Sequence, residues 1–248
     1  MIQYLFFHTT RTTALLVILA VLAAPALPTA PAGAGSDFQK RRMAMVENQL
    51  ADRGIGDPEV LAAFRSVKRH RFVPEHLRSV AYADRPLPIG KGQTISQPYI
   101  VAFMTQALAV EKSDKILEIG TGSGYQAAIL AEICEQVYTI EIIPELARRA
   151  RGVLADAGYT NVRTKIGDGY QGWPEHAPYD GIIVTCAPTD IPDPLKQQLA
   201  DGGRMVIPVG ETFDQELVVM VKKDDRLVKK DSLPVRFVPM VDKSGKTR

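Results

Sequence analysis

Short apolar runs alternate with amphipathic stretches between residues 115 and 209. Ile116, Leu117 and Ile119 form the first run, and the apolar stretch 125–133 after a glycine-rich turn is long enough for a helix. Short apolar runs bounded by turn signals are typical of buried parallel strands. Strands that alternate with helices predict a doubly wound, mostly parallel α/β sheet with helices on both faces. The other elements expected in this core are strands over 136–141, 162–167, 181–186 and 204–209 and helices over 144–157 and 194–200.

The stretch before this core predicts helices. Apolar residues at helical spacing indicate a helix over 38–53, and Gly54 is placed to end it. Asp57 then precedes Pro58 and an apolar face, which is the pattern of an N-cap followed by a first helical turn. A third helix is expected over 100–109.

The last part of the chain predicts two adjacent strands. Residues 216–222 and 227–233 are expected to pair as a hairpin about 224–226, an antiparallel addition at the sheet edge. The basic residues from Lys222 to Lys230 are interrupted by two aspartates, which favours a solvated hairpin turn.

Composition and charge are those of an ordinary globular chain. Of the 248 residues, 46% are hydrophobic and 23% are charged, and the formal net charge is +2. The basic residues are dispersed among acids, so the sequence gives no support for a nucleic-acid-binding surface. Cys134 and Cys186 lack CxxC spacing, which favours reduced core thiols over a disulfide or a metal pair. His70, His76 and His176 are scattered along the chain, and no metal site is expected.

Residues 1–36 do not fit the pattern of the core. Arg11 precedes an apolar stretch at 14–24, and an Ala-Gly-Ala triplet follows. A positive start, an apolar run of about 7–15 residues and a small-residue cleavage site are typical of a secretory signal. An uncleaved anchor, or a true start at Met43 or Met45, would explain the same pattern.

These boundaries predict a signal-like leader or N-terminal extension over 1–36 and a single domain over 37–248. That domain is expected to contain a helical part with a loop at 37–110, a cofactor-binding core at 111–210 and C-terminal strands at 211–248. The leader suggests export to the periplasm, and a cytoplasmic location is the alternative.

The segment Lys115–Gln126, KILEIGTGSGYQ, is a strand, a glycine loop and the start of a helix. Gly120, Gly122 and Gly124 allow tight turns and a close approach of the backbone to a ligand. This arrangement holds a nucleotide cofactor in many α/β proteins. The run from Gly122 to Ala127 also satisfies the dinucleotide pattern, so the glycines alone do not identify the cofactor.

Three carboxylates at predicted strand ends distinguish the candidate cofactors. Glu118 precedes the glycine loop, Glu141 ends the second strand, and Asp168 lies between two glycines after the third. At these ends Glu141 can accept hydrogen bonds from ribose hydroxyls, and Asp168 can reach an adenine amino group. A carboxylate disfavours a nearby pyrophosphate and attracts the ammonium and sulfonium of S-adenosylmethionine. The acids therefore favour S-adenosylmethionine, while Glu118 as a loop-orienting carboxylate and Asp168 as a helix N-cap are structural alternatives.

Several ordered motifs add a family resemblance to this pattern. Residues 88–104, PIGKGQTISQPYIVAFM, form a predicted loop over 89–98 and the start of a helix, and LEIGTGSGYQAAILA follows. Together with further segments, this part of the chain resembles the protein-L-isoaspartate O-methyltransferase family over about residues 40–241. The GQTISQP loop is the most specific motif. The further matching segments lie at 71–75, 167–188, 202–210 and 235–240.

The resemblance implies a Rossmann-like class I methyltransferase fold and repair of isoaspartyl residues in damaged proteins. The family methylates the free carboxylate of L-isoaspartyl residues, and also of D-aspartyl residues, and the ester then collapses to a succinimide. The implied catalytic residue is Ser96 and the implied partners are isoaspartyl proteins and peptides, with a monomeric enzyme and no nucleic acid. The implied cofactor positions are Ile95, Ser96, Gln97, Glu118, Gly120, Thr121, Gly122, Gly124, Glu141, Ile142, Asp168 and Gly169. The implied substrate positions are Thr94, Ile95, Ser96, Val235, Arg236, Phe237 and Val238.

The chemistry explains why a serine suffices. A substrate carboxylate, with an unperturbed pKa of about 4, is ionised at neutral pH and needs no general base. The task that remains is to orient it toward the methyl group, and the Ser96 hydroxyl can donate one hydrogen bond without protonating it. An ST-turn before Pro98 is the structural alternative for Ser96.

The substrate positions near Val235 have a structural alternative as well, because Val235, Phe237 and Met240 also fit an edge strand or core packing. Two rival functions remain open from the residues alone. One is methylation of another carboxylate substrate, and the other is a non-catalytic, exported binding domain that kept the fold.

Overall fold

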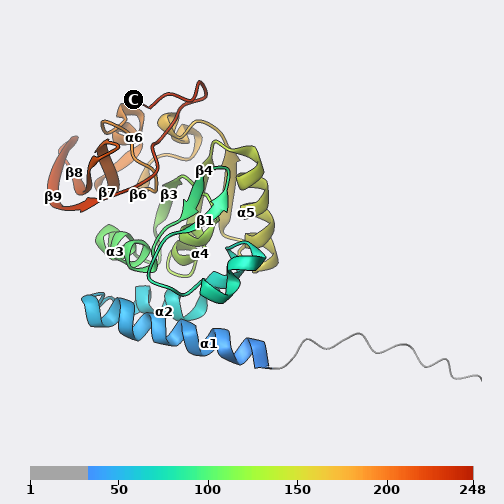
Figure 1. Cartoon of the computed structure of the whole chain (residues 1–248). Helices are drawn as coiled ribbons and strands as arrows, with labels where there is room; N and C mark the ends of the chain where they lie inside the picture. The colour runs from blue at the N-terminus through green and yellow to red at the C-terminus, as the bar shows by residue number, and fades with distance from the viewer. Residues whose placement is uncertain (1–32, 248) are drawn as a thin grey trace, which may run out of the picture.

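A computed structural model describes residues 33–247, with side chains from Asp37 onward, so the leader prediction falls almost wholly outside the described residues. Seven strands form one sheet in the order β5-β4-β3-β6-β7-β8-β9 (Figure 1). The strands from β5 to β7 run parallel, and β8 pairs antiparallel with both β7 and β9. The predicted doubly wound α/β sheet with an antiparallel edge is therefore confirmed. The strands are β3 (Lys115–Ile119), β4 (Gln136–Glu141), β5 (Val162–Ile166), β6 (Tyr179–Val184), β7 (Leu199–Glu211), β8 (Asp214–Lys223) and β9 (Arg226–Val235).

Helices cover both faces of the sheet because successive strand residues point to opposite sides. Ile116 packs in one apolar cluster with side chains of α3, α4 and α5, whereas its neighbour Leu117 packs in a second cluster with α6. Glu118, the next residue, shares the face of Ile116 and so points toward α3 and α4. The helices of the core are α3 (Pro98–Leu108), α4 (Tyr125–Ala131), α5 (Pro144–Asp156) and α6 (Asp193–Gln198). Short 3-10 helices lie at Arg69–Arg71, Glu75–Val80, Gly169–Gln171 and Pro174–His176.

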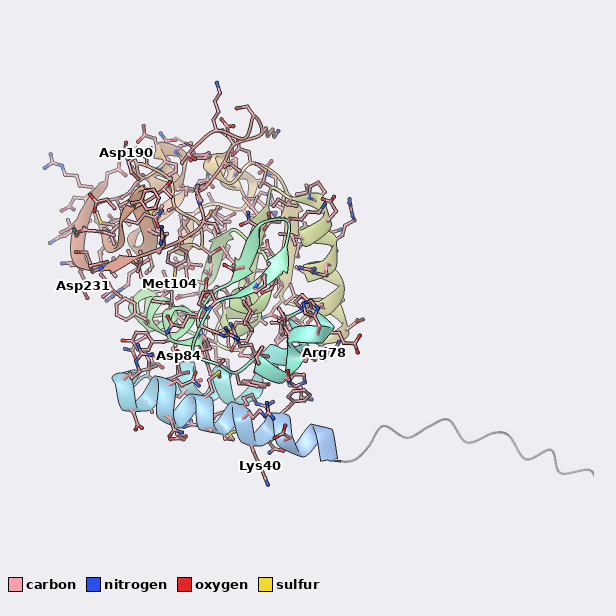
Figure 2. The ribbon with its side chains drawn as sticks, viewed as in Figure 1. Lys40, Arg78, Asp84, Met104, Asp190 and Asp231 are labelled. Carbon is pink, nitrogen blue, oxygen red and sulfur yellow. The ribbon has the colours of Figure 1, made fainter. Side chains whose placement is uncertain are left out.

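The N-terminal helices pack against each other below the sheet as it is drawn in Figure 1. Helix α1 (Gly33–Met45) continues through a π-helical turn (Val46–Leu50) and a 3-10 turn (Ala51–Arg53), and Gly54 ends it in the left-handed region. Helix α2 (Pro58–Ser66) begins as predicted, since Asp57 Oδ1 accepts hydrogen bonds from the Glu59 and Val60 amides. The outer face of α1 is solvated, and Lys40 projects away from the molecule (Figure 2).

The expected loop over 89–98 is partly wrong. Its first half forms a small antiparallel hairpin with the residues before it, β1 (Leu87–Gly90) and β2 (Gln93–Ile95). Ile89 and Ile95 are almost fully buried in the main apolar cluster, so tertiary packing stabilises a hairpin too short to be recognised from periodicity.

The C-terminal hairpin is confirmed, but one part of its predicted turn is wrong. The chain reverses at Asp224 and Asp225, which have φ angles of 50° and 62°. Lys222 was expected to be solvated with the other lysines, yet it is only 9% exposed. Its Nζ donates to the carbonyls of Lys196 and Leu199, so this lysine ties the hairpin to the end of α6.

Cys134 and Cys186 are free thiols. Across residues 33–247 there is no group of His, Cys, Asp and Glu side chains that could hold a metal ion. Within that same part of the chain no helix is both long and apolar enough to cross a membrane.

Truncation of the central strand tests this packing. We expect Leu117→Ala, which opens a cavity at a fully buried site, to lower the free energy of unfolding by about 2–5 kcal/mol. Denaturant unfolding of ligand-free protein measures the change. Ile166→Ala, the same kind of truncation at a site that is 43% exposed, is the control and should have a much smaller effect. Equal losses at the two sites would contradict the assignment of β3 to the core.

Candidate active site

The glycine loop lies between β3 and α4 at the carboxyl end of the sheet. Gly120 has φ +95°, and a Cβ there would lie 2.5 Å from Thr185 Oγ1, so both the turn and the close approach of β6 require glycine. The amides of Gly120 and Thr121 both donate to the Ile140 carbonyl of β4. Gly124, with φ +85°, is the residue that precedes α4 and packs against α5. The loop is thereby fixed to β4, β6 and α5.

Glu118 is fully buried beneath this loop. Its Oε2 accepts a hydrogen bond of 2.5 Å from Thr139, and the Thr121 hydroxyl lies 2.6 Å from that of Thr139. Its Oε1 is buried without a hydrogen-bond partner among the described residues. Burial raises the pKa of Glu118 to about 8, the hydrogen bond from Thr139 opposes this rise, and the charge of Glu141 adds to it. An unpaired oxygen of a buried acid is a place for a cationic or hydrogen-bond-donating group of a ligand.

Glu141 ends β4 beside the loop and is 6% exposed. Its Oε2 accepts from the Gly122 amide at 2.8 Å, and its Oε1 accepts from the Ile143 amide at 2.9 Å. Burial raises the pKa of this carboxyl, while the two backbone amides favour the charged form. Each oxygen keeps a further lone pair, so the side chain can still accept bonds from two hydroxyl groups of a ligand.

Asp168 and Gly169 follow β5. Asp168 Oδ1 accepts from the Tyr170 amide at 3.0 Å, so its side chain caps the short helix that begins at Gly169. The alternative role predicted for Asp168, that of a helix N-cap, is therefore present in the structure. Gly169 approaches β3 closely, because a Cβ there would lie 2.4 Å from Ile119 Cγ2. The Tyr170 hydroxyl donates to the Met240 carbonyl and holds the C-terminal segment over this point.

These groups surround a cleft with about 600 Å³ of empty space, which includes solvent at its mouth. No lysine or arginine is among the described side chains that line this cleft, so nothing on its walls would neutralise a pyrophosphate. Glu141 lines this cleft, and Glu118 lines a smaller adjoining cavity that shares Thr94, Gly120, Gly122 and Thr185 with it. Both acids suit a ligand with positive charge and a ribose. The residues present therefore fit S-adenosylmethionine better than a dinucleotide. The cleft is lined by Gln93, Thr94, Ile119, Gly120, Gly122, Ile140, Glu141, Ile142, Ile143, Gly169, Thr185, Cys186, Val238, Pro239, Met240 and Val241.

Ser96 lies between the β1–β2 hairpin and α3. It is half-buried, and its carbonyl accepts a hydrogen bond of 2.7 Å from Nη2 of the buried Arg69. Ile95 is buried beneath the hairpin, and Thr94 is exposed on the hairpin. Gln97 precedes α3 without a side-chain capping bond.

A second cleft has about 1290 Å³ of empty space, which likewise includes solvent at its mouth, and Ser96 is one of its lining residues. Thr94, Thr185, Val238 and Pro239 line both clefts, so the two spaces meet at these residues. The predicted substrate residues Val235 to Val238 line the second cleft together with Ser96.

The segment after β9 is held in place at both ends. Gln215 accepts from the Phe237 amide at 2.7 Å and donates to the Phe237 carbonyl at 3.3 Å. Further along, the Val238 carbonyl accepts from the Ala187 amide, and the Met240 amide donates to the Ala187 carbonyl. This anchoring carries the C-terminal segment from the sheet edge across the carboxyl ends of the strands.

The predicted cofactor residues are divided among three adjoining spaces. The first cleft is lined by Gly120, Gly122, Glu141, Ile142 and Gly169, the smaller cavity by Ile95, Ser96, Glu118 and Thr121, and the second cleft by Gln97 and again by Ser96. Gly124, which precedes α4, is absent from the lining of all three spaces. Asp168 is used as a cap and is also absent from that lining. Thr185 was missed because it lies within the strand predicted over 181–186. In the structure β6 ends at Val184, so the rule for carboxyl ends applies to Thr185 as well.

Comparisons with known proteins agree with this geometry. A family model described as protein-L-isoaspartate(D-aspartate) O-methyltransferase matches residues 40–245. A protein-L-isoaspartate O-methyltransferase from Picosynechococcus sp. is 59% identical over 199 residues, which cover 80% of this chain and 89% of that protein. One from Methanoculleus marisnigri is 54% identical over 210 residues, which cover 84% of this chain and 94% of that protein.

Solved structures extend the similarity to the fold. A protein-L-isoaspartate O-methyltransferase structure aligns with a TM-score of 0.72 at 28% identity and covers 82% of this chain and 65% of that chain. A putative protein-L-isoaspartate O-methyltransferase from Plasmodium falciparum, in complex with S-adenosyl-L-homocysteine, aligns with a TM-score of 0.71 at 25% identity. It covers 80% of this chain and 97% of that chain. By the extent of the family match and the identity to its relatives, this chain belongs to the protein-L-isoaspartate(D-aspartate) O-methyltransferase family.

Proposed function

We propose that this protein methylates the free carboxylate of L-isoaspartyl residues in damaged proteins and peptides, with S-adenosylmethionine as the methyl donor. The resulting ester collapses to a succinimide without the enzyme, and hydrolysis of the succinimide returns part of the residue to normal aspartate. Family membership supports this activity, and D-aspartyl residues are a further substrate class named in the family description.

The observation that carries the proposal is the meeting of two clefts at Thr94 and Thr185. One cleft has the buried Glu141 and no cationic side chain on its described walls, and the buried Glu118 lines the cavity that adjoins it. The other is an open groove beside an extended segment. Ser96 lines the second cleft and the smaller cavity, both of which also include Thr94 and Thr185. A donor in the first cleft and an acceptor in the second would face each other there, which is the arrangement that group transfer requires.

In this arrangement S-adenosylmethionine supplies an activated methyl group on a positively charged sulfur. Glu141 accepts hydrogen bonds from the ribose while its backbone contacts hold Gly122 and Ile143 in place. The Oε1 atom of the buried Glu118 accepts a hydrogen bond from the cationic part of the donor, and the carboxylate, when ionised, carries the opposite charge. Gly120 and Gly169 keep the cleft open by having no side chain where β6 and β3 come close.

Ser96 orients the acceptor carboxylate by donating one hydrogen bond. A carboxylate is already ionised at neutral pH, so this role requires no proton transfer. Thr94 and Thr185 add hydroxyl groups where the two clefts meet. No acid among the described residues lines the second cleft, and none there would repel the substrate.

The peptide groove is suited to backbone recognition. Val235 pairs with Gln215, and the backbone of Phe237 bonds to the Gln215 side chain, so both residues face β8. Alternate residues of an extended segment face the opposite direction, which leaves the Arg236 backbone groups and the Val238 amide for a substrate strand. Such pairing would accept many substrate sequences.

We further propose that residues 37–248 act as one methyltransferase domain and that the protein is a monomer that does not bind nucleic acid. The dispersed charges support the last point.

The direct test uses full-length protein, S-adenosylmethionine with a labelled methyl group, and two peptides of one sequence that contain isoaspartate or aspartate. We expect base-labile label in the isoaspartyl peptide only. Label in neither peptide, together with no detectable binding of S-adenosylmethionine, would defeat the enzymatic function.

Ser96→Ala removes the proposed orienting hydroxyl. We expect turnover of the isoaspartyl peptide to fall about 10–100-fold, the loss of a hydrogen bond to a charged group, while the affinity for S-adenosylmethionine stays nearly unchanged. Initial rates and equilibrium binding measure the two quantities. Ser113→Ala, at an exposed site away from both clefts, is the control. Turnover equal to that of the parent would remove Ser96 from the mechanism.

Glu141→Gln replaces an oxygen that holds both the loop and the proposed ribose. An amide group there would face a backbone N–H, so we expect S-adenosylmethionine to bind more weakly by about 1–3 kcal/mol. Titration calorimetry gives the dissociation constants. Glu145→Gln, four residues further on in an exposed ion pair with Lys91, should bind like the parent. An unchanged constant in Glu141→Gln would show that the ribose lies elsewhere.

Glu118 predicts a pH dependence of stability in the ligand-free protein. Its pKa is raised from 4.5 to about 8 in the folded state, so folding favours the protonated form. The contribution of protonated Glu118 to the free energy of unfolding is fully present below about pH 4.5. It decreases as the pH rises toward 8, by at most about 1.4 kcal/mol per pH unit. Glu118→Gln should remove this fall. Denaturant unfolding between pH 5 and 8 measures it, and Glu135→Gln at an exposed site should keep the slope of the parent. Parallel curves for Glu118→Gln and the parent would show that Glu118 is ionised in the free protein.

A further inference from the structure

Arg69 is the largest fully buried side chain of the described residues, and no carboxylate pairs with it there. Its Nη1 atom is buried and has no hydrogen-bond partner in that part of the chain. A buried charge without a counter-ion is unfavourable for stability. The burial of an arginine at position 69 therefore needs an explanation other than a contribution to stability.

The contacts of Arg69 connect the two sides of the proposed site. Nη2 donates to the Ser96 carbonyl at 2.7 Å, and Nε donates to the Ala81 carbonyl at 2.8 Å. The guanidinium carbon also lies 4.7 Å from the ring centroid of Tyr125, the first residue of α4 after the glycine loop. One planar cation thus holds the Ser96 loop against the helix that follows the cofactor loop, and a lysine lacks the two-pronged geometry for this.

The charge of Arg69 persists at neutral pH. Burial lowers its pKa only to about 10, and the nearby Tyr125 opposes the decrease. The cavity beneath Ser96 has a single acid among its described lining residues, Glu118, and burial raises the pKa of that acid to about 8. At neutral pH in the free protein, the acid is therefore mostly protonated and does not neutralise the arginine.

We propose that Arg69 is a positioning residue for Ser96 whose uncompensated positive charge also makes the acceptor subsite prefer an anionic carboxylate over a neutral group. The inference rests on the proposed function. In that reaction a carboxylate oxygen forms a bond to the methyl carbon as the methyl–sulfur bond breaks, and the negatively charged substrate becomes a neutral ester. The attraction to Arg69 is then lost, so the same charge that favours substrate binding favours release of the product.

A purely structural role is the competing explanation, and Arg149 provides a matched control for it. Arg149 lies at the surface on α5, and its Nη2 donates to the Ile89 carbonyl of the same hairpin that carries Thr94 and Ile95. Both arginines therefore anchor a backbone carbonyl near Ser96, but only Arg69 does so as a fully buried charge.

The experiment compares two peptides of one sequence in the presence of S-adenosylhomocysteine, so that no turnover occurs. One contains isoaspartate and the other contains isoasparagine, in which a neutral carboxamide replaces the free carboxylate. Equilibrium binding of both peptides to full-length parent, Arg69→Gln and Arg149→Gln gives the ratio of the two affinities for each protein.

We expect the parent and Arg149→Gln to prefer the carboxylate peptide by the same factor. In Arg69→Gln that preference should fall on the order of tenfold, since a unit charge is removed from the buried position directly behind the Ser96 backbone. Equal weakening of both peptides, with the ratio unchanged, would overturn the electrostatic role. A parent that binds neither peptide would instead defeat the proposed function on which the inference rests.

Arg69→Lys keeps the proposal testable if Arg69→Gln does not fold. The lysine keeps the charge without the fork that holds two carbonyls, so we expect an unchanged affinity ratio and turnover reduced about tenfold or more. Unchanged turnover in Arg69→Lys would overturn the positioning role. A fall in the ratio of peptide affinities as large as the one expected for Arg69→Gln would show that the preference for the carboxylate does not come from the charge.

Discussion

The interior around the glycine loop is determined by the burial of two ionisable side chains, Glu118 and Arg69, that have no ion-pair partner within the described residues. Each is surrounded by polar groups that a conventional core would not contain. Thr139 donates a hydrogen bond to Glu118, and the ring of Tyr125 lies against the guanidinium of Arg69. Apolar residues of similar volume would make such a core more stable, so this region gives up stability for the sake of the site.

The sequence predicted the parallel core well because each strand there is a short apolar run with a clear turn signal on both sides. Strand β4 has the predicted limits, and helix α5 ends one residue before them. The failures occur where local pattern is weak and distant contacts decide. The β1–β2 hairpin depends on burial of Ile89 and Ile95 in a core built by other elements, and Lys222 is buried because the end of α6 offers it two carbonyls. Neither partner can be read from the neighbouring sequence.

The candidate site shows the same division. The rule that ligands bind at the carboxyl ends of parallel strands, together with the family resemblance, led to Glu118, Glu141 and Ser96. It did not show how these side chains are used, because the backbone contacts of Glu141 and the capping role of Asp168 depend on loop geometry. The role of Arg69 could not be predicted from the sequence. Its carbonyl partner on Ser96 is 27 residues away, and only the folded chain reveals the contact.

The proposed roles also explain how one site can accept many sequences and still recognise one kind of damage. Backbone pairing along Arg236 and Val238 reads any extended peptide, and a buried cation attracts any carboxylate, so neither alone selects isoaspartate. What remains is the separation between the groove wall and Ser96. An isoaspartyl linkage routes the main chain through the side-chain carboxyl and leaves the other carboxylate on a shorter branch than that of aspartate. Selectivity then depends on a rigid junction, and the β1–β2 hairpin, fixed by buried Ile95 and by the bond from Arg69 to Ser96, supplies that rigidity.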